Sequence, residues 1–167
     1  TLLRFEREVQ ATASLTHWNT VQVFDYGHAK DGTFYYVMEL LHGMTAEEIV
    51  KKFGQLPAAR VIHFLRQTCH ALNEAHCKGL IHRDIKPGNL FVAECGCIHD
   101  TIKILDFGLV RDSMNRDTDI QITQPGSFSG SPLYMCPEQM NTFDQLDARS
   151  DLYSLGAVAY YMLTRRP

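Results

Sequence analysis

The chain has 167 residues and a net charge of −3, from 16 basic and 19 acidic side chains. Hydrophobic residues make up 45% of the sequence and charged residues 21%, which is typical of a soluble globular protein and excludes a disordered one. Without a basic excess, nothing suggests nucleic acid as the main partner. Five cysteines, an odd number in a sequence without secretory marks, favour free thiols in the cytoplasm over a disulfide framework.

The first half of the chain predicts helices and one hairpin. Residues 2–15 place apolar side chains along one helical stripe, and residues 45–53 predict a short helix. Two β-rich runs, 21–26 and 34–40, flank Lys30-Asp31-Gly32 and predict a β-hairpin. A longer helix after Pro57 ends before Gly79, which caps it. Its apolar stripe comprises Val61, Leu65, Thr68 and Leu72, flanked by Ile62 and Cys69.

The second half predicts strands at 90–92 and 102–105, joined through a turn. The polar stretch 112–130 carries little apolar surface and is expected to be the least ordered. A last helix is expected over 149–163. Its apolar run is too short to cross a bilayer, so a buried helix is the better interpretation and no membrane anchor is visible. The fold class that follows is α+β.

The strongest chemical signal is a polar loop followed by an acidic residue at a strand end. Asp84, Lys86 and Asn89 share one loop, and Asp106 comes 17 residues after Asn89, directly behind a strand. Phosphoryl transfer needs these residue types. Asp84 accepts the proton of an incoming hydroxyl, Lys86 neutralises charge on the transferred group, and Asn89 and Asp106 offer hard oxygen ligands to Mg²⁺. Any one of them alone is most simply a solvated polar residue, but the two motifs in order favour the chemistry.

The motifs around these residues resemble those of protein kinases. His82-Arg83-Asp84-Ile85-Lys86-Pro87-Gly88-Asn89 and Asp106-Phe107-Gly108 resemble the catalytic and metal-binding loops of that family, within which the chain looks like the bacterial Hanks-type Ser/Thr group. Residues 130–139, GSPLYMCPEQ, are similar to its substrate platform, and residues 151–156, DLYSLG, to a later helix. The resemblance implies transfer of the γ-phosphoryl of ATP, with Mg²⁺, to Ser or Thr hydroxyls of protein substrates.

The resemblance also implies roles for single residues. Met38, Glu39 and Leu41 match the gatekeeper and hinge that hold adenine, and Phe91 matches the floor of the adenine pocket. Glu8 stands at the position that pairs with a strand lysine. The nucleotide site would then comprise Glu8, Met38, Glu39, Leu41, Lys86, Asn89, Phe91 and Asp106. Structural roles are implied for His82, Phe107, Glu138 and Asp151, the last as an anchor for the backbone around His82 and Arg83.

The segment from Asp106 to Glu138 resembles an activation segment, which predicts regulation by phosphorylation. Thr123 is the first expected phosphosite, followed by Ser127 and Ser129. A phosphate there would accept charge-assisted hydrogen bonds from Arg83 and Arg111 and would position Ser131 beside Asp84. The resemblance leaves room for dimerisation during trans-autophosphorylation.

Two parts of a complete kinase do not occur in this sequence. No G-x-G-x-x-G is present, and no lysine precedes Glu8. We interpret the chain as an excerpt: residues 1–41 are part of the small lobe through the hinge, and residues 42–167 are the large lobe, ending after the last predicted helix. The excerpt alone is expected to be inactive. The alternative is a pseudokinase that binds nucleotide or partners as a scaffold, and the upstream sequence distinguishes the two.

Overall fold

The computed structural model describes residues 12–105, 107, 132–141 and 146–166. Most of the helix predicted over 2–15 and the polar stretch 112–130 lie outside these residues, so both remain predictions. The same holds for a group of the predicted site residues, namely Glu8, Asp106, Arg111, Thr123, Ser127, Ser129 and Ser131.

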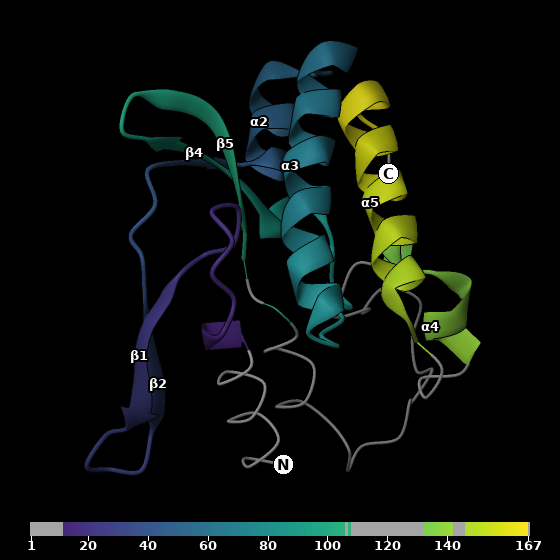
Figure 1. Cartoon of the computed structure of the whole chain (residues 1–167). Coiled ribbons are helices and arrows are strands. Elements are labelled where there is room, and N and C mark those ends of the chain that lie inside the picture. The colour runs from purple at the N-terminus through teal and green to yellow at the C-terminus, as the bar shows by residue number, and fades with distance from the viewer. Residues whose placement is uncertain (1–11, 106, 108–131, 142–145, 167) are drawn as a thin grey trace.

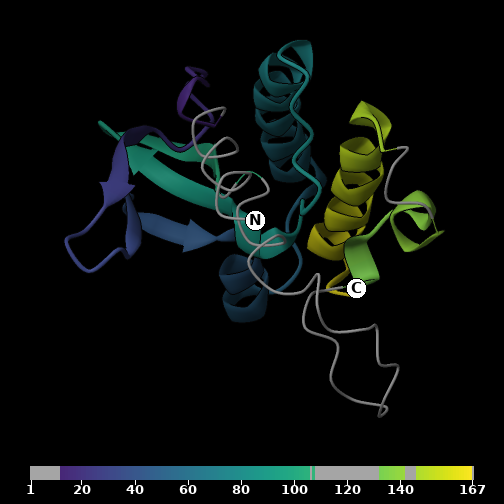
Figure 2. The ribbon, with the colours of Figure 1, turned by 90° about the horizontal axis from the view of Figure 1, so that it is seen from below.

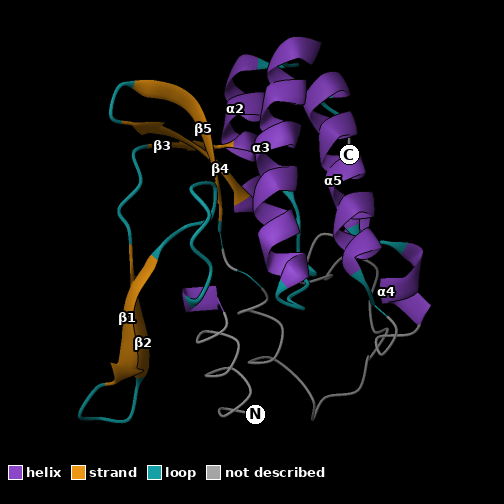
Figure 3. Ribbon diagram, viewed as in Figure 1, coloured by secondary structure: helices purple, strands orange, loops and turns teal. Residues whose placement is uncertain are grey.

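Five strands of the described part form two antiparallel sheets (Figure 3). The first sheet is the predicted hairpin of β1 (Val23–His28) and β2 (Phe34–Met38), in which Tyr26 pairs with Tyr36. The second sheet has the order β3-β4-β5, from β3 (Gly43–Thr45), β4 (Leu90–Cys95) and β5 (Ile98–Ile104). β4 and β5 extend the strands predicted at 90–92 and 102–105 towards each other.

Three helices make up most of the other half of the molecule, and the two longer ones stand side by side (Figures 1 and 2). They are α2 (Ala46–Phe53), α3 (Ala58–Cys77) and α5 (Ala148–Thr164), and all three lie where the sequence predicts helices. The short helix α4 (Pro137–Asn141) precedes α5, and two 3-10 turns, η1 (Pro87–Asn89) and η2 (Pro132–Tyr134), carry the polar motifs. No described helix combines the length and the apolar character needed to cross a membrane.

The core lies between α3, α5 and the second sheet. On α3 the predicted stripe is buried at Val61, Thr68 and Leu72, and Phe64, which the stripe did not include, is fully buried. The prediction that Ile62 and Cys69 flank the buried stripe was wrong, because Ile62 is 64% exposed and Cys69 is also exposed. The buried face is therefore rotated towards Phe64 and Ala71, because β5 and α5 pack against that side of the helix.

α5 is buried on one side only. Leu155, Val158 and Met162 belong to the core, whereas Tyr153 and Tyr160 are each 53% exposed. The prediction of a buried helix thus holds for one face. The predicted helix-ending glycine is confirmed at Gly79, two residues after the last residue of α3. Its φ of 74° is the left-handed conformation that glycine accepts most easily.

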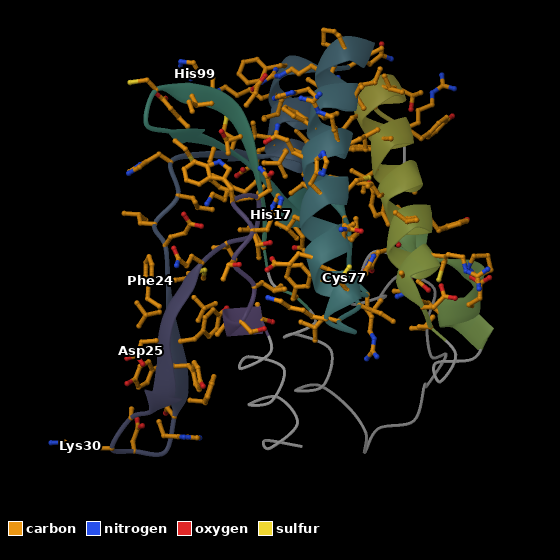
Figure 4. The ribbon with its side chains drawn as sticks, viewed as in Figure 1. His17, Phe24, Asp25, Lys30, Cys77 and His99 are labelled. Atoms are coloured by element: carbon orange, nitrogen blue, oxygen red, sulfur yellow. The ribbon has the colours of Figure 1, made fainter. Side chains whose placement is uncertain are left out.

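The tips of the two hairpins point away from the helices, with Lys30 at one and His99 beside the other (Figure 4). Gly96 and Cys97 both have positive φ, 55° and 68°, which is the geometry of a tight two-residue hairpin turn. The β4–β5 hairpin is fastened to α3 by Arg60. Its Nε and Nη2 donate to the two carboxylate oxygens of Asp100 at 2.9 and 2.7 Å.

Gly43 carries the chain from the hinge onto the second sheet. Its φ is 151°, and a Cβ at this position would lie 2.1 Å from the carbonyl oxygen of Val92. Only glycine allows so close a backbone approach. This contact fixes β3, and with it the start of α2, against the strand that follows the catalytic motif.

Candidate active site

The three predicted catalytic residues of the 82–89 loop lie together in the structure. Nζ of Lys86 donates to Oδ2 of Asp84 at 2.6 Å. Nδ2 of Asn89 donates to the backbone oxygen of Asp84 at 2.8 Å and to its Oδ2 at 3.2 Å. Asn89 is buried, while the side chains of Lys86 and Asp84 are 31% and 22% exposed. The loop thus presents a carboxylate and an ammonium group at its surface, supported from below by a buried amide.

The loop is joined to the end of β5. The backbone N–H of Leu105 donates to the carbonyl of Asn89 at 2.9 Å. Nδ1 of His82 accepts from the N–H of Asp84, which leaves Nε2 to donate to the carbonyl of Leu105 at 2.9 Å. The ring of Phe107 lies 4.6 Å from that of His82 and is buried. His82 and Phe107 therefore connect the two motifs that the sequence analysis paired, and the structural roles predicted for them remain predictions.

Asp151, near the start of α5, holds the backbone of the loop. Its Oδ2 accepts from the N–H of His82, and its Oδ1 accepts from the N–H of Arg83, both at 2.9 Å. His76 on α3 lies against the same carboxylate, with Nε2 at 2.8 Å from Oδ2. Asp151 is only 1% exposed, so these contacts satisfy a buried carboxylate. Asp151 therefore contacts the backbone that it is predicted to anchor, and the anchoring role itself remains a prediction.

Gln139 is a supporting residue to which the sequence analysis gave no role. Its Nε2 donates to the carbonyl of Arg83 at 2.8 Å, and its Oε1 accepts from the N–H of Cys136 at 3.1 Å. Arg83 has a φ of 65°, a conformation that costs free energy outside glycine. Asp151 and Gln139 together fix both backbone groups of this strained residue. The signal in the sequence was a polar residue in the GSPLYMCPEQ motif.

The hinge residues lie between the two sheets. Glu39 directs its carboxylate to Lys103 on β5, with Nζ at 2.8 and 3.0 Å from the two oxygens, and one oxygen also accepts from the N–H of Gln22. The Glu39 side chain therefore fastens the hinge to β5, while Met38 and Leu41 continue the chain on either side. Phe91 pairs with Thr45 and Lys103 in the second sheet, and its role as the floor of the adenine pocket remains a prediction.

A cavity of about 350 Å³ lies against the hinge. Trp18, Glu39, Leu41 and Lys103 are among the residues that line it. Trp18 is 61% exposed, and Nζ of Lys103 lies 5.0 Å from the centre of its indole ring. Glu39 and Leu41 thus line the cavity, whereas Met38 and Phe91, the other residues of the implied adenine site, do not.

Glu74 on α3 fastens the segment that leads from the chain start to the first sheet. Its carboxylate accepts from the N–H of Thr16 at 3.1 Å, the N–H of His17 at 2.9 Å and Nζ of Lys78 at 2.9 Å. Burial disfavours the charged form of Glu74, but these hydrogen bonds, from Lys78 first and then from Thr16 and His17, outweigh it and lower its pKa to about 2.

Two further predicted site residues are described. The side chain of Arg83 is exposed, on the surface of the loop whose backbone is fixed from below. Glu138 is exposed in α4, so the structural role predicted for it remains a prediction. Among the described residues, no group of three or more His, Cys, Asp or Glu side chains has the arrangement of a metal site.

Comparison with known proteins identifies the family to which this chain is similar. The family model described as the protein kinase domain matches residues 3–167. The chain is 38% identical over 164 residues, 98% of its length, to the serine/threonine-protein kinase pkn3 of Myxococcus xanthus. Over 168 residues, 99% of its length, it is 40% identical to the serine/threonine-protein kinase PknB of Mycolicibacterium smegmatis and 39% identical to PknB of Mycobacterium tuberculosis.

The match covers nearly all of this chain but a smaller part of its relatives. The chain spans 30% of the length of the Myxococcus protein and 26% of each mycobacterial protein. The matched region includes the 82–89 loop, residues 38–41 and α5, which carries Asp151, and the α+β fold class is confirmed. The chain belongs to the protein kinase domain family, as a fragment of a bacterial Hanks-type serine/threonine kinase domain.

Proposed function

We propose that the protein containing this chain transfers the γ-phosphoryl group of ATP to Ser or Thr hydroxyls of other proteins. The observation that carries the proposal is the arrangement of Asp84, Lys86 and Asn89 in one loop, with an ion pair of 2.6 Å and an amide that supports the carboxylate. The identity to proteins named as serine/threonine-protein kinases supports the same function.

In the proposed reaction the hydroxyl oxygen of the substrate forms a bond to the γ-phosphorus, the bond between the γ-phosphorus and the β,γ-bridging oxygen breaks, and ADP leaves. Asp84 accepts the hydroxyl proton through Oδ2 or Oδ1. Lys86, beside that carboxylate, neutralises the charge on the transferred phosphoryl group. The rigid attachment of the loop to Asp151 and Gln139 keeps Asp84 in place, so little reorganisation accompanies the transfer.

Mg²⁺ and ATP fit the residues present. Because Nδ2 of Asn89 is directed at Asp84, its amide oxygen is the atom able to ligate a cation, and Asp106 would supply a carboxylate. Mg²⁺ supplies neutralisation of the triphosphate when bound. The residues on either side of Asp106, Leu105 and Phe107, both contact the catalytic loop, which supports the assignment. The hinge backbone at Met38–Leu41 and the Phe91 ring would hold adenine, with Glu8 acting through the strand lysine it is expected to pair with.

We assign residues 1–41 to part of the small lobe and 42–167 to the large lobe of this kinase, and we expect the kinase domain to act in the cytoplasm. Lys86, two residues after the base, and Ser131, at the start of the substrate platform, favour Ser/Thr over Tyr substrates. Protein substrates and ATP are the expected partners.

The test is a pair of substitutions in the full-length protein. Asp84→Asn keeps the shape of the side chain and removes the proton acceptor, so we expect kcat to fall by about 10²–10⁴-fold with Mg-ATP affinity nearly unchanged. Asp106→Asn is expected to weaken Mg-ATP binding itself. Phosphate transfer to a Ser/Thr peptide mixture and calorimetric nucleotide binding separate the two effects. An active Asp84→Asn protein would overturn the role of the base, and a wild-type protein that binds nucleotide without transfer would favour the scaffold alternative.

We further propose activation by phosphorylation of Thr123, with Ser127 and Ser129 as further sites. The exposed Arg83 side chain stands on the catalytic loop, and with Arg111 it would bind the phosphate and so bring Ser131 to Asp84. Mass spectrometry of the active protein should find phosphate on Thr123, and Thr123→Ala should lower kcat by about tenfold or more. Full activity of the unphosphorylated variant with alanine at all three positions would contradict the switch.

A further inference from the structure

The turn of the β4–β5 hairpin carries two cysteines, Cys95 and Cys97, separated by a glycine. Cys95 ends β4 and pairs with Ile98, so Gly96 and Cys97 form the turn itself. Both thiols are free, and Cys97 is exposed while Cys95 is half-buried. The turn lies at the hairpin tip that points away from the helices, beside His99 (Figure 4). A reagent in solution can therefore reach Cys97 without any movement of the fold.

Cys97 adopts a backbone conformation that a cysteine does not favour. Its φ is 68°, in the left-handed region that glycine and asparagine accept most easily. Two-residue hairpin turns of this kind select such residues at both positions, as Gly96 shows with a φ of 55°. A residue other than glycine that is held at positive φ costs free energy, which points to a role for its side chain. The thiol is the functional group that Cys97 offers.

The two cysteines are close enough along the chain to be joined by a disulfide bond. Two steps along an extended chain span at most about 7 Å, and the reversal at the turn shortens the separation of the two Cα atoms. Disulfide bonds join residues whose Cα atoms lie about 4.4–6.8 Å apart. Gly96 lies between them, and apart from its chain neighbours no described atom lies within 4 Å of the place where its Cβ would be. The turn therefore has room to adjust to the bond.

The other cysteines provide a comparison. Cys69 and Cys77 are both exposed, but they lie eight positions apart on α3, which separates them by about 12 Å along the helix axis. They are too far apart to be joined to each other. Burial raises the pKa of the Cys69 thiol, which lowers the fraction present as the reactive thiolate. Cys69 is therefore an internal reference for the reactivity of the hairpin pair.

The hairpin below the turn is fastened on both strands. On β4, the N–H of Glu94 donates to the carbonyl of His42 at 2.9 Å. On β5, the carboxylate of Asp100 accepts both hydrogen bonds from Arg60. Once one thiol of the turn has been oxidised, the other is thus held near it. Such preorganisation favours a reaction within the chain over a second reaction with a molecule from solution.

We propose that Cys95 and Cys97 form a reversible disulfide bond, which makes the hairpin turn a redox-sensitive site of the protein. Disulfide bonds that form in the cytoplasm are usually transient, and they respond to the redox state of the cell. This bond would be exposed and would close a ring over a single glycine, so small thiols can reduce it again. The inference goes beyond the proposed function, because it requires no transfer of phosphate.

The oxidant is a low-molecular-weight disulfide, for which glutathione disulfide is the probe. The thiolate of Cys97 attacks one sulfur of the probe, a mixed disulfide forms, and one glutathione leaves. The thiolate of Cys95 then attacks the sulfur of Cys97, the bond within the turn forms, and the second glutathione leaves. Two electrons pass from the protein to the probe, and the two thiol protons end on the two released glutathione molecules.

The experiment exposes the reduced full-length protein to mixtures of glutathione and glutathione disulfide and then alkylates every remaining thiol. Mass spectrometry of the peptide with Cys95 and Cys97 should show the loss of two hydrogens and no alkylation, while Cys69 is still alkylated. An excess of glutathione should restore both thiols. Cys95→Ser should instead carry glutathione on Cys97 at a level about tenfold above that of the wild type, because no second thiol displaces it.

Two further variants act as controls. Cys69→Ser should leave the loss of two hydrogens unchanged, which excludes Cys69 as the partner. Cys97→Gly keeps the backbone conformation of the turn and removes the thiol, so it should fold and leave Cys95 alkylated.

The inference would be overturned if Cys95 and Cys97 both stayed alkylated, or if each carried a separate glutathione. A bond that links two chains, which electrophoresis without reductant detects, would also reject it. None of these measurements uses kinase activity, so failure of this inference and failure of the proposed function are distinguishable.

Discussion

At the scale of single residues, the carboxylate of Glu74 is stabilised by hydrogen bonds from neighbouring residues. Glu74 accepts hydrogen bonds from Thr16, His17 and Lys78, and Lys78 also donates to the carbonyl of Ser14 at 2.6 Å. One carboxylate thus fastens the segment before the first sheet to α3. Because its pKa is lowered from 4.5 to about 2, the folded protein favours its ionised form.

We expect Glu74→Gln to lower the free energy of unfolding by about 1–3 kcal/mol at pH 7, because the amide offers one acceptor in place of two. The pKa of Glu74 is lower in the folded state than in the unfolded one. Its contribution is therefore present above about pH 4.5 and lost as the pH falls towards 2. Urea unfolding of the wild type and the variant should show a difference that narrows below pH 4.5, and a difference constant down to pH 3 would contradict the assignment. Glu94→Gln, at an exposed acid, is the control.

At the scale of elements, α2 is short and its ends are fixed by its own sequence. Thr45 Oγ1 accepts from the N–H of Glu48, and Oε2 of Glu48 accepts from the N–H of Thr45. This reciprocal arrangement satisfies two backbone donors that a helix start leaves open. It also orients the first turn, from which Glu47 reaches the catalytic loop.

Replacing the capping residue should therefore lower the stability of the protein. For Thr45→Ala we expect a loss of about 1 kcal/mol in the free energy of unfolding, the usual cost of a removed cap. Thr45→Ser, which keeps the hydroxyl, should lose much less. Thermal denaturation measures both variants, and equal melting temperatures for Thr45→Ala and the wild type would show that the cap contributes nothing.

At the scale of the whole molecule, α5 is the support for the catalytic loop. Its Asp151 bonds to the backbone of His82 and Arg83 and to His76 of α3, so one buried carboxylate joins a helix, a second helix and the loop. Gln139 adds a further bond from α4. The position of Asp84 is therefore determined by residues that are distant in the sequence.

Asp151→Asn should cost about 2–4 kcal/mol of stability, because an amide presents N–H groups to donors in a buried site. In the full-length protein kcat should fall more than KM rises, since the loop geometry is affected and not the surface that binds substrate. Melting temperature and steady-state kinetics measure the two effects. Asp25→Asn, on the exposed strand β1, is the matched control and should change neither. A stable and fully active Asp151→Asn protein would show that the loop holds its shape without this anchor.

The sequence by itself determined the features that depend on neighbouring residues. Asp84, Lys86 and Asn89 fall within six positions, so their loop brings them together, and the hairpin around Lys30-Asp31-Gly32 follows from local turn chemistry. The positions of Pro57 before α3 and Gly79 after it were also predicted, because proline and glycine restrict the backbone locally.

Only the tertiary structure decided which distant groups meet. His76 and Asp151 are 75 positions apart, Arg83 and Gln139 are 56 apart, and nothing in their local sequence specifies the pairing. The buried face of α3 followed Phe64 rather than Ile62 and Cys69 for the same reason, since β5 and α5 select the side on which they pack. Helical periodicity identifies a stripe, but burial is a property of the partners, and those are set by the packing of the whole chain.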